Sequence, residues 1–73
     1  MSIMKEQRIV IKKYPIRLGQ FLKLAEITSD GIEAKQLITS NKVLVNNIID
    51  SRRGRQLIQG DLVVVDGNSY LCI

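Results

Sequence analysis

The side chains of this sequence best suited to bind a ligand are three arginines within four positions, in the stretch S-R-R-G-R at residues 51–55. A guanidinium is planar, permanently charged and rich in N–H donors, and its geometry matches the oxygens of a phosphate group. Gly54 would allow a bend and a close approach of the backbone. The spacing therefore predicts a phosphate-binding segment formed by Arg52, Arg53 and Arg55, although a solvated basic loop would show the same pattern.

The side chains that carry most enzyme chemistry are absent from the sequence. There is no histidine, so the usual general base is missing, and one cysteine without histidine excludes an ordinary zinc site. Neither common glycine-rich phosphate loop, G-x-x-x-x-G-K-[ST] or G-x-G-x-x-G, occurs. The lone Cys72 lies in the apolar run Y-L-C-I, where a core role is expected. We therefore expect no catalytic residue, no metal and no cofactor, and a protein that is not an enzyme.

The composition is that of a small basic globular chain. Hydrophobic residues make up 45% of its 73 residues, and eleven Lys and Arg against seven Asp and Glu give a net charge of +4. The basic residues end at Arg55 and the acidic Asp61 and Asp66 follow, which favours one positive face and a polyanionic partner. A disulfide within the chain is impossible, no apolar run approaches the roughly 20 residues of a membrane helix, and no signal peptide is apparent. The sequence predicts one cytoplasmic domain over residues 1–73, with no membrane partner.

The hydrophobic pattern predicts the elements that position these side chains. Residues 7–13 are rich in β-formers, with Ile9 and Ile11 on one face, and Pro15 ends that strand. An amphipathic helix follows, opened by Arg17, because apolar residues recur at i, i+3, i+4 and i+7. This apolar stripe consists of Leu18, Phe21, Leu22 and Ala25.

A second helix is predicted after a T-S-D-G break. It begins at Asp30, whose carboxylate caps free N–H groups together with Glu33 three residues on. Lys35 lies beside the buried stripe, near solvent, and Asn41 ends the helix in a left-handed conformation. The stripe itself consists of Ala34, Leu37 and Ile38.

The last part of the chain has the pattern of antiparallel strands. V-L-V, N-N and I-I-D at residues 43–50 form a β-hairpin, since asparagine tolerates the positive φ of a type I′ turn. A loop over residues 51–61 leads to the strand L-V-V-V-D, and D-G-N-S turns into a last strand, Y-L-C-I. The order β-α-α-β-β-β-β predicts an α+β fold in which two N-terminal helices pack on a small curved, mainly antiparallel sheet.

Several stretches occur in an order and spacing that is typical of one family. They are R-L-G-Q-F-L at residues 17–22, D-G-I-E-A-K-Q-L-I at 30–38, N-K-V-L-V-N-N at 41–47 and G-D-L-V-V-V at 60–65. They resemble the S4 RNA-binding domain over about residues 16–66, and the chain is similar to the small stand-alone bacterial S4-like proteins of the YaaA/YbcJ type. The resemblance implies the S4-like fold known as the α-L motif.

The resemblance also implies that the two helices and the hairpin grip structured RNA. By position in the family pattern, Arg17 is the arginine that opens the first helix, and Lys35 follows the alanine of the second. Lys42 leads into the hairpin strand.

Three departures from the family pattern bear on RNA binding. Gly19 replaces the usual acid, Asp30 and Gly31 replace a Ser-Arg pair, and Asn47 stands where the turn glycine usually is. One phosphate contact expected from the missing arginine is thereby lost, and the arginines of residues 52–55 would compensate for it.

We therefore expect a monomer that binds folded RNA, either ribosomal or tRNA-like, as an accessory to ribosome assembly or translation. The ribosomal subunit is the expected partner and no small-molecule substrate is expected. With two tyrosines and one phenylalanine, the chain has too few rings to stack the bases of single strands. The predicted RNA-contacting residues are Arg17, Gln20, Lys35, Asn41, Lys42, Asn47, Arg52, Arg53 and Arg55.

Two other classes of binding protein stay open. A protein-binding adaptor would keep the S4 fold, bind an acidic protein and have little RNA affinity. A DNA-binding module has less support, because no predicted helix combines basic residues with Asn or Gln spaced for the major groove. Competition between duplex DNA and structured RNA separates these classes.

Overall fold

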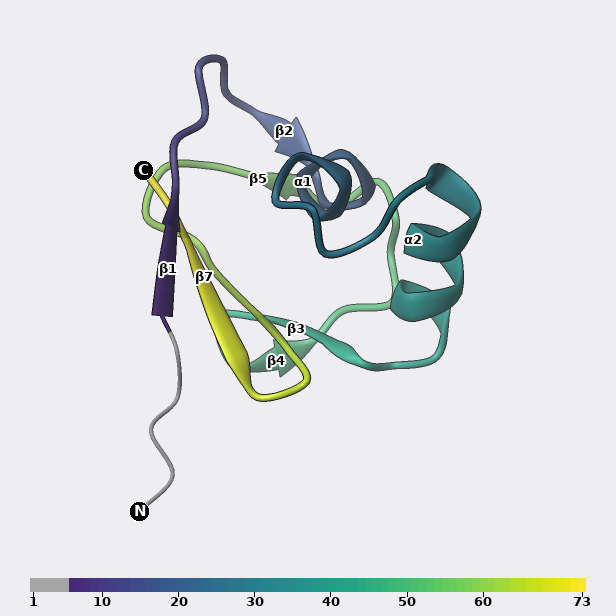
Figure 1. The fold of residues 1–73 in the computed structure, drawn as a ribbon. Coiled ribbons are helices and arrows are strands. Elements are labelled where there is room, and N and C mark those ends of the chain that lie inside the picture. The colour runs from purple at the N-terminus through teal and green to yellow at the C-terminus, as the bar shows by residue number, and fades with distance from the viewer. Residues whose placement is uncertain (1–5) are drawn as a thin grey trace.

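The computed structural model describes residues 6–73, which form two helices and two β-sheets (Figure 1). The helices are α1 (Leu18–Leu24) and α2 (Gly31–Thr39). The strands are β1 (Glu6–Ile9), β2 (Ile16–Arg17), β3 (Val43–Val45), β4 (Ile48–Ile49), β5 (Gln56–Leu57), β6 (Leu62–Val65) and β7 (Asn68–Cys72). Five strands form a sheet in the order β1-β7-β6-β3-β4, and β2 pairs with β5 in a second, two-stranded sheet.

The apolar stripes of the two helices form one side of the core. Leu18, Phe21 and Leu22 of α1 are fully buried. In α2, Ile38 is fully buried and Ala34 is 1% exposed. Predicted stripe residues at the margins, among them Ala25 at the end of α1, are partly buried and pack against this cluster. The helical periodicity in the sequence is therefore confirmed by burial.

The first turn of α2 is capped by acidic side chains, as predicted. Asp30 Oδ1 accepts a hydrogen bond from the Glu33 backbone N–H at 2.8 Å. The Glu33 carboxylate accepts one from the backbone N–H of Ser29 at 3.3 Å, one residue earlier than a capping box requires.

The last turn of α2 ends at Asn41, which has a left-handed conformation with φ of 60°. The N–H of Asn41 donates to the carbonyl of Ile38, and the N–H of Lys42 donates to the carbonyl of Leu37. These two bonds are those of a Schellman motif, which satisfies carbonyls that the helix itself leaves free.

One face of the five-stranded sheet forms the other side of the core. Burial alternates along β3 and β6, where Val43, Val45, Val63 and Val65 are buried and the residues between them are half-buried. In β7, Tyr70 and Cys72 are buried on the same side as these valines. This alternation is the period-two pattern of a sheet that packs on helices.

The β3–β4 hairpin turns at Asn46 and Asn47, with φ of 52° and 69°. Two successive residues with positive φ are typical of a type I′ turn, so the predicted turn is confirmed. The side chain of Asn46 also ties the turn to β6. Its Oδ1 accepts from the Leu62 N–H at 3.0 Å, and its Nδ2 donates to Asp61 Oδ1 at 3.1 Å.

The structure adds two short strands to the predicted order. Residues 56–57, expected within a loop, form β5 and pair antiparallel with β2 at residues 16–17. The first strand ends at Ile9 rather than at residue 13, and it pairs in parallel with β7. Ile11 continues the contact through a single hydrogen bond to the Ile73 carbonyl at 2.9 Å. Neither helix of the described part of the chain is long and apolar enough to cross a bilayer.

Candidate nucleic-acid interface

The arginine segment at residues 52–55 lies against the start of α1. The N–H of Leu18 donates to the Arg55 carbonyl at 2.8 Å, and the N–H of Gly19 donates to the Arg53 carbonyl at 3.1 Å. First-turn N–H groups have no partner within their own helix, so the segment supplies what α1 lacks. The β2–β5 pairing, in which Arg17 opposes Gln56, continues this docking.

Two of the three arginines bind one buried carboxylate. Asp50 is 5% exposed. Its Oδ1 accepts from the Arg52 N–H at 3.0 Å and Nε at 3.1 Å, and its Oδ2 accepts from Arg52 Nη2 at 2.9 Å and Arg55 Nη1 at 2.7 Å. The hydrogen bonds from Arg52, reinforced by Arg55, hold the pKa of the Asp50 carboxyl well below its usual range, against the opposing effect of burial. Arg52 and Arg55 are therefore part of the structure that fixes the segment.

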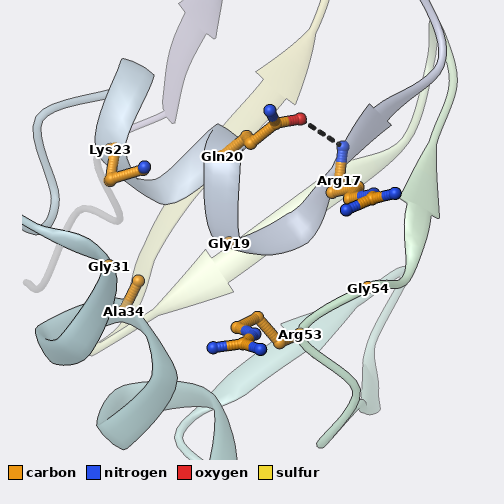
Figure 2. Close-up of a pocket in the computed structure, with 8 residues that line it drawn as sticks. All are labelled: Arg17, Gly19, Gln20, Lys23, Gly31, Ala34, Arg53 and Gly54. Atoms are coloured by element: carbon orange, nitrogen blue, oxygen red, sulfur yellow. Dashed lines mark hydrogen bonds between the residues drawn. The ribbon is translucent and has the colours of Figure 1, made fainter.

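The third arginine, Arg53, extends its side chain into a cleft between the two helices (Figure 2). The cleft has a volume of about 350 Å³ and lies between α1, the first turn of α2 and the arginine segment. Its lining residues are Arg17, Gly19, Gln20, Lys23, Gly31, Ala34, Arg53 and Gly54. We call it the helix cleft.

The helix cleft carries three exposed cations and, among the residues described, no acidic lining residue. Arg17 comes from β2, Lys23 from the last turn of α1, and Arg53 from the arginine segment. Within residues 6–73, the ion pairs of the protein involve Arg52 and Arg55. The three cations of the cleft have no carboxylate partner in that range and can pair with a ligand. Such a concave cationic surface suits the phosphate groups of a polyanion.

Lys35 adds a fourth cation beside the helix cleft. It is exposed and lies one helical turn beyond Gly31, so both residues are on the same side of α2. Lys42 lies on the opposite side of that helix, where it lines a shallow groove of about 260 Å³ together with Glu33 and Gln36. Lys35 is therefore on the side of α2 that carries the cleft residue Gly31, and Lys42 is on the other side.

The remaining predicted contact residues are Gln20, Asn41 and Asn47. Gln20 lines the helix cleft, and its Oε1 accepts from the Arg17 N–H at 3.5 Å, at the outer limit of a hydrogen bond. Asn41 forms the left-handed end of α2, and Asn47 is exposed at the hairpin tip. Gly54 has no positive φ, and a Cβ there would meet nothing within 4 Å, so the turn itself does not require a glycine.

Sequence reasoning missed two features. One is the position of Lys23 in the helix cleft, and the other is the difference between Arg53, which lines the cleft, and Arg52 and Arg55, which bind Asp50. Lys23 follows Gly19 by one helical turn and therefore shares its face of α1, which is the signal that could have identified it. The difference between the arginines could not be read from the spacing, because it depends on the buried carboxylate of Asp50. Gly19 and Gly31, which depart from the family pattern, both line the cleft that Arg53 enters.

The aromatic rings and the cysteine belong to the core. Phe21 is fully buried, Tyr70 is 9% exposed, and the Tyr14 hydroxyl donates to the Ile73 carbonyl at 2.9 Å. Burial, together with the Asp61 carboxylate, raises the pKa of the Cys72 thiol to about 11, which keeps it in the unreactive protonated form. Among residues 6–73, no group of three or more His, Cys, Asp or Glu side chains could hold a metal ion.

This chain belongs to the S4 domain family, because the model of that family matches residues 9–72. It is 50% identical over 52 residues to the probable ribosome maturation protein RlbA of Bacillus subtilis, a match that covers 71% of this chain and 73% of that protein. It is 40% identical over 55 residues to the small ribosomal subunit protein uS4m of Schizosaccharomyces pombe. That match covers 75% of this chain and 17% of the relative.

The fold is similar to the solution structure of YbcJ from E. coli, with a TM-score of 0.68 and 27% sequence identity. The similarity covers 100% of this chain and 91% of YbcJ, whose structure is described as revealing an α-L motif involved in RNA binding. The predicted S4-like α+β fold is therefore confirmed.

Proposed function

We propose that this protein binds folded RNA through the helix cleft, as an accessory to the maturation of the ribosome. The observation that carries this proposal is the convergence of Arg17, Lys23 and Arg53, from three separate elements, on one cleft that no acidic residue of the described range 6–73 lines. Phosphate contacts of this kind position a protein on RNA, while the shape of the folded RNA limits where it can dock. Lys35 on the rim adds a further contact.

Ribosomal RNA is the proposed ligand because of the relatives of the chain. RlbA carries the name of a ribosome maturation protein, uS4m is a ribosomal subunit protein, and YbcJ is described as having an RNA-binding motif. The buried aromatic side chains favour folded RNA over single strands, since Phe21 and Tyr70 offer no exposed ring for stacking. We propose that residues 1–73 act as one domain, as a monomer, in the cytoplasm.

The test is equilibrium binding to ribosomal subunits and to folded ribosomal RNA across a salt series. If Arg17, Lys23, Lys35 and Arg53 each contact one phosphate, log K should fall with log salt with a slope of about −3. Arg53→Ala should weaken binding about tenfold and reduce the slope by about 1. Arg8→Ala, at an exposed position of β1 outside the helix cleft, removes the same charge and is the matched control.

The control variant distinguishes the loss of a contact in the helix cleft from the loss of one unit of net charge. Arg8 does not line the helix cleft, so Arg8→Ala should reduce RNA affinity less than Arg53→Ala does. Equal losses in both variants would mean that RNA responds to net charge alone and would contradict the cleft. Binding that is indifferent to salt and to Arg53 would contradict RNA binding itself.

The alternative function is that of a protein-binding adaptor. One observation favours it: the edge strand β4 exposes Ile48 and Ile49 by 71% and 55%. An adaptor would bind an acidic protein partner without RNA and would lose that binding in Ile48→Ser rather than in Arg53→Ala. A separate control adds excess duplex DNA to the RNA-binding assay. If the DNA fails to compete with the RNA, a general affinity for polyanions is excluded.

A further inference from the structure

Gly19 on α1 faces the side chain of Arg53 across the helix cleft (Figure 2). A Cβ at residue 19 would be 3.0 Å from Arg53 Cγ and 3.7 Å from its Cδ. The first of these distances is shorter than ordinary van der Waals contact. The stem of Arg53 therefore occupies the space that any side chain at position 19 would need.

The backbone of α1 gives no reason for a glycine at this position. Gly19 lies within the helix and does not have a positive φ, and alanine is the better helix former. Gly31, on the opposite wall of the helix cleft, differs from Gly19, because a Cβ there would meet nothing within 4 Å. Of these two cleft glycines, only Gly19 makes room for a neighbouring side chain.

The surroundings fix the backbone of Arg53, and its side chain extends from there across Gly19. Its carbonyl accepts the Gly19 N–H at 3.1 Å, and the arginines on either side are held by Asp50. A long arginine side chain loses much rotamer freedom on binding unless it is already placed. With its stem laid across Gly19, the guanidinium already lies in the cleft in the ligand-free structure.

We propose that Gly19 is a positioning residue for RNA binding, which acts by leaving Arg53 the space to lie across α1 with its guanidinium in the helix cleft. This inference rests on the proposed function, in which Arg53 contacts an RNA phosphate. Gly19 itself need not touch the RNA.

A double-mutant cycle tests the proposal with Gly19→Ala, Arg53→Ala and the combined variant, each measured on folded ribosomal RNA at low salt where all bind detectably. Gly19→Ala should weaken binding about fivefold and reduce the magnitude of the salt slope, as Arg53→Ala does. In the Arg53→Ala background, where no Cγ is left to displace, Gly19→Ala should change affinity less than twofold.

Two further measurements exclude a structural explanation. The thermal midpoint of Gly19→Ala should equal or exceed that of wild type, because alanine favours the helix and Arg53 is a flexible neighbour. Gly31→Ala is the matched comparator, since it adds the same methyl group to the same cleft where nothing has to move, and it should weaken binding less.

Each other outcome overturns the proposal in a recognisable way. Equal losses from Gly19→Ala in both backgrounds, or an equal loss in Gly31→Ala, would mean that the methyl group obstructs the RNA directly. No loss in Gly19→Ala would mean that Arg53 does not need this space. If Arg53→Ala itself has no effect, the proposed function fails together with the inference, whereas a loss in Arg53→Ala alone leaves the function standing.

Discussion

At the scale of residues, Asp50 separates arginines that are nearly adjacent in sequence. Four hydrogen bonds from Arg52 and Arg55 converge on its carboxylate, and Arg53 between them turns to the helix cleft. The three-arginine pattern predicted a phosphate-binding segment, and of its three members only Arg53 lines the helix cleft. Spacing alone could not reveal this, because it does not show whether the carboxylate of Asp50 is buried or solvated.

Replacement of Asp50 by asparagine should destabilise the fold. The variant leaves the hydrogen bonds of Arg52 and Arg55 weakened at a site that is 5% exposed, which should cost about 1–3 kcal/mol of the free energy of unfolding at pH 7. Urea denaturation of both proteins measures the difference. An unchanged midpoint would show that this carboxylate does not hold the segment.

The same comparison has a defined pH dependence. The pKa of Asp50 is lowered in the folded protein, so its stabilisation is complete above the unfolded pKa, near 4, and is lost as the pH falls below that value. The stability gap between wild type and Asp50→Asn should therefore narrow between about pH 5 and pH 2. A gap that stays constant over this range would contradict the ionised pair.

At the scale of elements, the parts that sequence predicted are those with strong local patterns. The stripes of both helices, the Asp30 cap and the two-asparagine turn each depend on residues within a few positions of one another, and all are present. The β2–β5 pair and the parallel β1–β7 pair were not predicted. Two-residue strands have no periodicity, and pairing partners about 40 or 60 residues apart leave no local signal.

The end of α2 offers a test at this scale, because Asn41 has a left-handed conformation. Asn41→Ala should lower the free energy of unfolding by about 1 kcal/mol, since a Cβ without a polar group is disfavoured there, whereas Asn41→Gly should not. Chemical denaturation distinguishes the two variants, and equal stabilities would contradict the assigned role. Binding of RNA by the glycine variant then reports on the amide alone.

At the scale of the whole molecule, the net charge of +4 is distributed so that one cleft has no acidic lining residue among residues 6–73. The sequence predicted Arg17 and Arg53 as RNA-contacting residues, and both line the helix cleft. The sequence did not predict that Lys23 lines the helix cleft, or that Lys42 lies outside it. Both depend on how the two helices pack against each other and against the arginine segment. The family resemblance supplied the fold, and the structure supplied the grouping of charges.

The most direct test of the account is a lysine footprint of the protein bound to ribosomal RNA. Acylation rates of each lysine, read by mass spectrometry with and without RNA, compare residues within a single sample. Lys23 and Lys35 should be protected several-fold, while the exposed Lys12 and Lys13, between β1 and β2, should react as they do in the free protein. Uniform protection of all lysines, or protection of Lys12 and Lys13 with Lys23 left reactive, would contradict RNA binding at the helix cleft.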